Sequence, residues 1–161
     1  MNSSWASFSE LEAGTTESGA LSAGSLLNFS SSFGQTFFIS IFAAQIMQDY
    51  ALSNGDWGRI YGAGTLASGL LMLWAGAYTD RYRARSLAVT MFCLMCGFCL
   101  AMAFNTSAAL LILIIFGLRF SGQGMLSHIA MVAMARWFVA ARGKAAAISR
   151  LGFSLGEALL P

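Results

Sequence analysis

Long apolar runs separated by short polar connectors constrain the fold of this sequence more than any other feature. An α-helix rises about 1.5 Å per residue, so about 20 apolar residues cross the hydrocarbon core of a bilayer. The sequence is 57% hydrophobic and only 10% charged, which is rare in a soluble domain. The runs therefore predict an all-α, polytopic membrane helix bundle with about five transmembrane helices. The expected spans cover residues 24–47, 57–78, 86–104, 108–135 and 145–161.

The segment before the first apolar run differs in composition from the rest of the chain. Residues 1–21 are rich in Ser, Gly and Ala, and they carry acidic residues but no basic one. A secretory signal begins with positive charge, so we expect a flexible cytoplasmic tail instead of a cleaved leader. Residues 22–161 then form the transmembrane bundle.

Basic residues gather in two connectors between the predicted spans. Residues 76–85 hold an acid and three arginines, and residues 136–144 hold two arginines and a lysine. Cytoplasmic loops of membrane proteins collect Lys and Arg, so both connectors and the N-terminus are predicted inside the cell. The net charge of +2 is too small to indicate nucleic-acid binding, and we expect no nucleic-acid partner.

Arg119, within the fourth apolar run, is the most informative polar residue in the predicted spans. A charged side chain at mid-membrane costs at least about 2.5 to 3.5 kcal/mol, so it indicates a functional site or an internal ion pair. Gln123 lies one turn further along the same helix face. Glu157 in the fifth span is the obvious acidic partner if Arg119 forms an ion pair.

Asn28, Ser32 and Gln35 lie at helical spacing on one face of the first span. Two interpretations remain open for this polar face, namely hydrogen bonds between helices and the lining of a cavity. Gln35 is the better cavity candidate because it is nearest the middle of the span.

Glycines predict two surfaces at which helices pack closely. Gly62, Gly69 and Gly76 form one stripe on the second span, and Gly152 and Gly156 form an edge on the fifth. Both are predicted helix-docking faces, because glycine lets backbones approach each other.

Three cysteines in the third span are spaced as two successive C-x-x-C pairs: Cys93, Cys96 and Cys99. The position at which a ferredoxin-like run would place its fourth ligand is Ala103, and no His or acid lies beside the thiols. We expect no metal and no cofactor. No nucleophile and base pair stands out either, so we expect no enzyme.

The segment 76–85 resembles the signature loop between the second and third helices of the major facilitator superfamily. The matching positions are Gly76, Asp80, Arg81 and Arg85. Arg119 with Gln123 and Gly124 is similar to a motif of that superfamily's fourth helix. The segment 136–144 is similar to the loop between helices four and five of bacterial permeases.

This resemblance implies a membrane transporter built from about twelve helices in two halves, with the solute held between them. In relatives, such an arginine is associated with proton coupling or with anionic substrate groups. The chain would then be the N-terminal part of a proton-coupled permease for a small solute. We expect it in the plasma membrane, most simply a bacterial inner membrane, with the missing C-terminal half as its partner.

The resemblance also assigns expected roles to individual residues. Gly76, Asp80, Arg81 and Arg85 would form a loop that acts in conformational change. The candidate substrate or coupling residues are Arg119, Glu157, Gln35 and Gln123. The alternative hypothesis is a short membrane scaffold or assembly subunit, which would bind partner helices through its polar faces without transporting anything.

Overall fold

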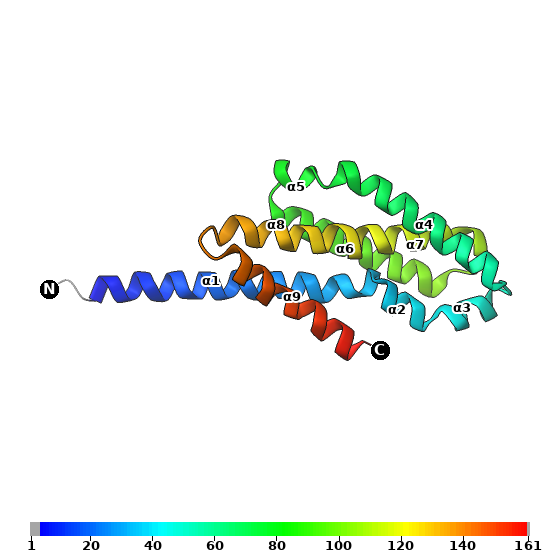
Figure 1. Cartoon of the computed structure of the whole chain (residues 1–161), viewed down its shortest axis with the longest axis horizontal. Coiled ribbons are helices and arrows are strands. Elements are labelled where there is room, and N and C mark those ends of the chain that lie inside the picture. Colours follow the sequence, from blue (N-terminus) through cyan, green and yellow to red (C-terminus); the bar gives the residue numbers. More distant parts are fainter. Residues whose placement is uncertain (1–3, 161) are drawn as a thin grey trace.

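The computed structural model describes residues 4–160, with side chains from Glu17 onward. The regular elements of this range are all helices, which confirms the predicted all-α membrane helix bundle (Figure 1). In chain order they are α1 (Ser4–Ser31), η1 (Ser32–Gly34), α2 (Thr36–Ile41), α3 (Ala43–Asp49), α4 (Asn54–Ala75), α5 (Tyr78–Arg81), α6 (Ala84–Phe104), α7 (Ala108–Leu118), η2 (Arg119–Leu126), α8 (Ser127–Trp137) and α9 (Arg142–Leu159).

Three segments of the described chain are long and apolar enough to cross a membrane: Asn54–Arg81, Ala84–Phe104 and Ala108–Trp137. They agree with the second, third and fourth predicted spans. The third of them, α7–η2–α8, is the centre of the bundle, since 56% of its apolar window is buried, compared with 11% and 6% for the other two. The remaining helices pack around it.

The first predicted span is helical but is not one continuous helix. The chain breaks at η1, where Gln35 adopts an extended backbone conformation (ψ 156°) before α2 begins. Ser32 and Gly34 favour such a break because both residues have low helix propensity. A second interruption at Phe42 separates α2 from α3.

The fifth predicted span corresponds to α9, which begins at Arg142. This helix is less apolar than the other spans, because Arg142, Lys144, Arg150 and Glu157 all lie within its 18 residues. It is therefore a helix of membrane-spanning length with a mixed composition.

Residues 4–21 of the predicted tail are helical and belong to α1, and the flexibility of this tail stays a prediction. Residues 1–3 lie outside the described part of the chain. The helix continues because this stretch contains alanines, leucines and glutamates and no proline that would end it. In Figure 1 the first turns of α1 extend past the other helices.

The contact between α1 and α9 confirms the predicted Gly152 and Gly156 edge. A methyl group added at Gly152 would collide with the backbone carbonyl oxygen of Ser25, and one added at Gly156 would collide with the Ser32 side chain. In the same contact, the amide of Asn28 donates a hydrogen bond to the Ser149 hydroxyl at 2.7 Å. The polar face of α1 therefore forms hydrogen bonds between helices at Asn28.

Of the predicted docking stripe on α4, only Gly76 lies close to a neighbouring helix, where an added methyl group would be 3.7 Å from His128 Nε2. Gly62 and Gly69 have no atom within 4 Å of an added methyl group, so neither contacts another helix of the described chain. The buried small residues of α4 are instead Gly64, Ser68 and Ala75. The other small-residue face of the helix packs on α7, where an added methyl at Gly64 would lie 3.0 Å from the Ile112 carbonyl oxygen.

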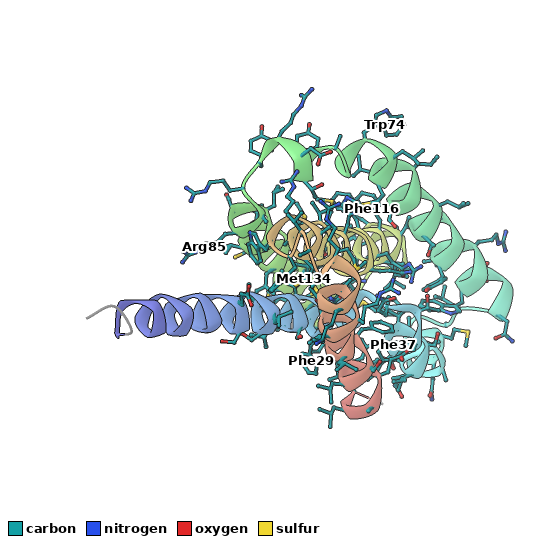
Figure 2. The ribbon with its side chains drawn as sticks, turned by 60° about the vertical axis from the view of Figure 1, so that its left-hand side comes forward. Phe29, Phe37, Trp74, Arg85, Phe116 and Met134 are labelled. Atoms are coloured by element: carbon teal, nitrogen blue, oxygen red, sulfur yellow. The ribbon has the colours of Figure 1, made fainter. Side chains whose placement is uncertain are left out.

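Large side chains divide between the interior of the bundle and its outer surface. Met134 is fully buried and lies among α8, α1 and α9, whereas Trp74 and Arg85 point away from the bundle (Figure 2). Exposed leucines on α4, such as Leu66 and Leu73, would contact lipid in a bilayer.

The α1–α9 contact generates a prediction for Gly152. We expect Gly152→Ala to destabilise the bundle by about 1–3 kcal/mol, because the Ser25 backbone cannot move aside without separating the helices. Thermal unfolding in detergent micelles, followed by tryptophan fluorescence, measures the effect. Gly69→Ala is the matched control, since its methyl group meets open space. Equal unfolding temperatures for the two variants would contradict the close packing.

Candidate functional site

An ion pair joins the two basic connectors. The Arg136 guanidinium at the end of α8 donates to the Asp80 carboxylate in α5 at 2.7 Å. This contact places segments 76–85 and 136–144 at the same end of the bundle, as the charge pattern predicts. The side chains of Asp80 and Arg136 are 74% and 45% exposed, so the pair contributes at most about 1 kcal/mol to stability.

A second contact holds the same connector against α8. The Thr79 hydroxyl donates to the Gly76 carbonyl at 2.7 Å and lies 3.3 Å from His128 Nε2. Thr79 is buried, and a methyl group added at Gly76 would lie 3.7 Å from the same imidazole nitrogen. The glycine and threonine of the connector therefore pack on α8, while Arg81 and Arg85 are exposed.

Arg119 is buried at the start of η2, with only 8% of its surface exposed. Its Nη1 donates to the Thr36 hydroxyl at 2.7 Å and to the Tyr61 hydroxyl at 2.9 Å. The guanidinium carbon also lies 5.4 Å from the centroid of the Tyr61 ring, within range of a cation–π interaction. We call these three residues, Thr36, Tyr61 and Arg119, the arginine cluster.

The arginine cluster brings together three different spans. Thr36 begins α2 directly after the break at Gln35, Tyr61 lies in α4, and Arg119 lies in the central helix. The two hydroxyls are themselves in contact, since Tyr61 donates to the Thr36 oxygen at 3.1 Å. Each member thus contacts both of the others.

The helix that carries Arg119 changes its winding at this point. Residues Arg119–Leu126 form a π-helix, a geometry found mostly as short segments that often occur at functional sites. Gly122 lies inside this segment and contacts Gly34, whose added methyl group would lie 2.8 Å from the Gly122 Cα. The absence of both side chains lets the backbone of the broken first span touch the widened helix.

Among the described residues, none of the other predicted site residues forms a hydrogen bond with Arg119, whose partners are Thr36 and Tyr61. Glu157 is exposed on α9, and no carboxylate of the described residues pairs with Arg119. Of the two alternatives for Arg119, the ion pair with Glu157 does not form among the described residues, and hydroxyl groups contact the guanidinium instead. Gln123 is exposed on η2, and Gln35 is half-buried at the break before α2.

Thr36 and Tyr61 are the site residues that the sequence analysis missed. Both are polar side chains inside apolar runs, which is a signal that a search restricted to charged and amide groups ignores. Their spacing in the chain gives no hint of proximity, because the contact is made between separate helices.

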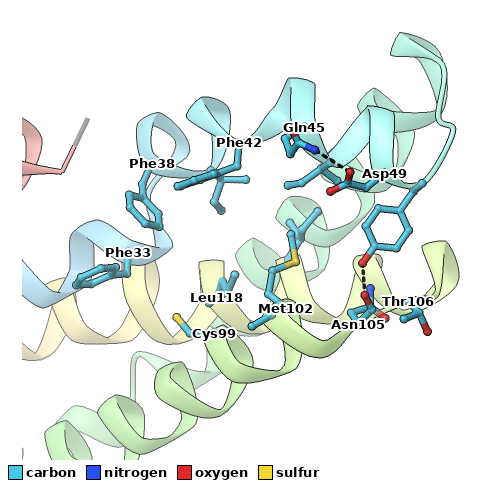
Figure 3. A pocket seen from close by; sticks show the side chains of 15 residues that line it. Phe33, Phe38, Phe42, Gln45, Asp49, Cys99, Met102, Asn105, Thr106 and Leu118 are labelled. Atoms are coloured by element: carbon cyan, nitrogen blue, oxygen red, sulfur yellow. Dashed lines mark hydrogen bonds between the residues drawn. The ribbon is translucent and has the colours of Figure 1, made fainter.

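A large apolar cavity of about 760 Å³ lies between α2–α3 and the ends of α6 and α7 (Figure 3). Two polar contacts lie at its rim, where Gln45 donates to Asp49 and Tyr50 donates to the backbone carbonyl of Asn105. Its aromatic wall is formed by Phe33, Phe38 and Phe42.

The cysteines of α6 do not form a cluster with other metal-binding groups. Cys93 and Cys96 are exposed and Cys99 is half-buried. Among the described residues, no group of three His, Cys, Asp or Glu side chains lies close enough to hold a metal ion.

A membrane helix bundle with a buried intramembrane arginine and a basic connector docked by an ion pair has the features of a helical membrane transporter. The chain belongs to the major facilitator superfamily: the family profile described as Major Facilitator Superfamily matches residues 24–161. Members of this family are transporters and not enzymes. Comparison with curated proteins and with solved structures finds no match.

The environment of Arg119 generates a prediction about stability. We expect Arg119→Met to stabilise the bundle by about 1–3 kcal/mol, because a buried charge without an opposite charge is replaced by an apolar chain of similar length. Thr36 and Tyr61 keep their mutual hydrogen bond in the variant. Thermal unfolding in detergent measures the change, and Arg85→Met is the control at an exposed arginine. A lower unfolding temperature for Arg119→Met than for the parent would show that Arg119 is structural.

Proposed function

We propose that the chain is the N-terminal part of a secondary active permease that moves a small solute in a proton-coupled manner. The observation that supports this proposal is the arginine cluster in the central helix of a major facilitator chain. A buried arginine held only by hydroxyls weakens the membrane helix that contains it, so a function is the simplest reason to retain it.

In this proposal, Arg119 binds the solute or takes part in proton coupling. Glu157 is the accessible acid that exchanges protons, since its side chain is exposed on α9. Gln35 and Gln123 would contact the solute from the edge of the break in the first span and from the π-helix. The connector with Gly76, Asp80, Arg81 and Arg85 would hold α8 through Arg136 in one conformational state.

The orientation and partners follow from the same proposal. The end of the bundle that carries both basic connectors would face the cytoplasm, with the N-terminus on that side. A bacterial inner membrane is the proposed location, and the partner is a C-terminal half that completes the solute path.

The proposal predicts a gene product longer than the sequence described. An antibody raised against residues 1–21 should detect a membrane protein well above 17.1 kDa, the mass of these 161 residues. Immunoblotting of native membranes makes this measurement. A single band at 17.1 kDa would favour the scaffold alternative or a transporter assembled from separate chains.

Two substitutions in the complete permease test the proposed coupling residues. Arg119→Ala should abolish uptake because the buried cation is lost, and Glu157→Gln should remove the dependence of uptake on the pH gradient. Uptake and proton movement are measured in vesicles with an imposed gradient, with and without a protonophore. Arg150→Gln changes another exposed charge of α9 and serves as the control. Unchanged gradient-driven uptake in both test variants would refute the assignment.

A further inference from the structure

The arginine cluster carries one positive charge without a negative partner. Arg119 is 92% buried (8% exposed), and the two ion pairs of the described residues, Asp56–Arg59 and Asp80–Arg136, do not include it. A buried charge is costly unless an opposite charge lies nearby. The hydroxyls of Thr36 and Tyr61 supply hydrogen bonds but no negative charge, so the cluster is electrostatically incomplete.

The hydrogen bonds of the cluster are also unbalanced. The Thr36 oxygen accepts from both Arg119 and Tyr61, which leaves its own hydrogen without an acceptor among the described residues. The Arg119 Nε–H is buried and likewise has no partner there. The cluster therefore has surplus donors and no free strong acceptor, the pattern of a receptor for an oxyanion.

The cluster is accessible from one side. Thr36 is exposed at the start of α2 and Tyr61 is half-buried, so the free hydroxyl hydrogen can meet a molecule arriving from outside this bundle. The Trp57 ring lies beside the Tyr61 ring, with 5.7 Å between the ring centroids and a tilt of 39° between the planes, and Gln123 is exposed one turn beyond Arg119. Trp57 therefore brings an aromatic ring to the edge of the same site.

The charge of the cluster sets the charge of its ligand. Arg59, the basic residue of α4, is paired with Asp56 at 2.7 Å. One unpaired guanidinium complements one negative charge, whereas a phosphate dianion would leave excess negative charge in a site of low polarity. A carboxylate also provides two oxygens that accept from several donors at once.

We propose that the arginine cluster binds the carboxylate group of a monoanionic solute. Thr36 and Tyr61 are positioning residues for the Arg119 guanidinium, and Thr36 also donates its free hydroxyl hydrogen to the carboxylate. This inference rests on the proposed function, since it identifies the chemical class of the transported solute.

Binding to the 161-residue chain tests the inference without any transport assay. The chain is labelled with ¹⁵N-arginine in detergent micelles, and the Nε–H signal of Arg119 is assigned by its loss in Arg119→Lys. Acetate is titrated at pH 7 and constant ionic strength, and acetamide is the neutral probe of the same shape. We expect acetate to displace the Arg119 signal saturably and acetamide to leave it unchanged.

Isosteric variants separate a positioning role from a general effect on the fold. Thr36→Val and Tyr61→Phe should each weaken acetate binding about tenfold or more, because each removes a hydroxyl from a charge-assisted network. Ser40→Ala is the matched control, since this α2 hydroxyl is already bonded to the Thr36 carbonyl. The signals of the other arginines report whether each variant remains folded.

Three outcomes would overturn the inference: no saturable displacement by acetate, an equal displacement by acetamide, or unchanged affinity in both Thr36→Val and Tyr61→Phe. Stronger displacement by inorganic phosphate than by acetate would overturn the preference for a monoanion. Acetate binding with no transport by the complete protein would count against the proposed function only. Transport of neutral solutes without acetate binding would count against the carboxylate site only.

Discussion

The burial of one positive charge in an apolar bundle is the constraint on which the arrangement of the spans depends. Arg119 can lie in the central helix only because hydroxyls from α2 and α4 reach its guanidinium. The same hydrogen bonds link the first, second and fourth spans at one level of the membrane. A shift of either Thr36 or Tyr61 by a single helical step would leave the charge without these partners.

Close backbone contacts make this geometry possible. The first span breaks at η1 and the central helix widens at η2, and the two irregular segments meet at Gly34 and Gly122. The break turns Thr36 to the start of a new helix, from which its hydroxyl reaches Arg119. On the other side of α1, Gly152 lets α9 pack against the backbone. Small residues thus replace the hydrophobic effect as the cause of tight helix packing in lipid.

Features that depend on one helix or one loop could be predicted from the sequence. The helical class, the second to fourth spans, the basic connectors and the position of Arg119 inside an apolar span follow from hydropathy and charge along the chain. Features that depend on the rotation of one helix against another could not. The stripe at Gly62 and the buried face at Gly64 differ by half a turn, and both satisfy the same small-residue pattern. The partners of Arg119, Thr36 and Tyr61, were missed because a single hydroxyl side chain is tolerated in a membrane helix without any partner. Its presence in an apolar run therefore does not indicate a site.

The exposed side of the arginine cluster limits what can surround this bundle in a membrane. Leucines on the outer face of α4 are compatible with lipid, because acyl chains are as apolar as the side chains. The surface at Thr36 is different, since its hydroxyl hydrogen lacks an acceptor and a guanidinium lies directly beneath it. Hydrocarbon offers no acceptor for that hydroxyl hydrogen and no negative charge for the guanidinium. An unsatisfied polar group in hydrocarbon costs several kcal/mol, roughly as much as one buried in a protein core. This face must therefore meet water or a polar protein surface, which is the environment that a solute path between two halves of a transporter provides.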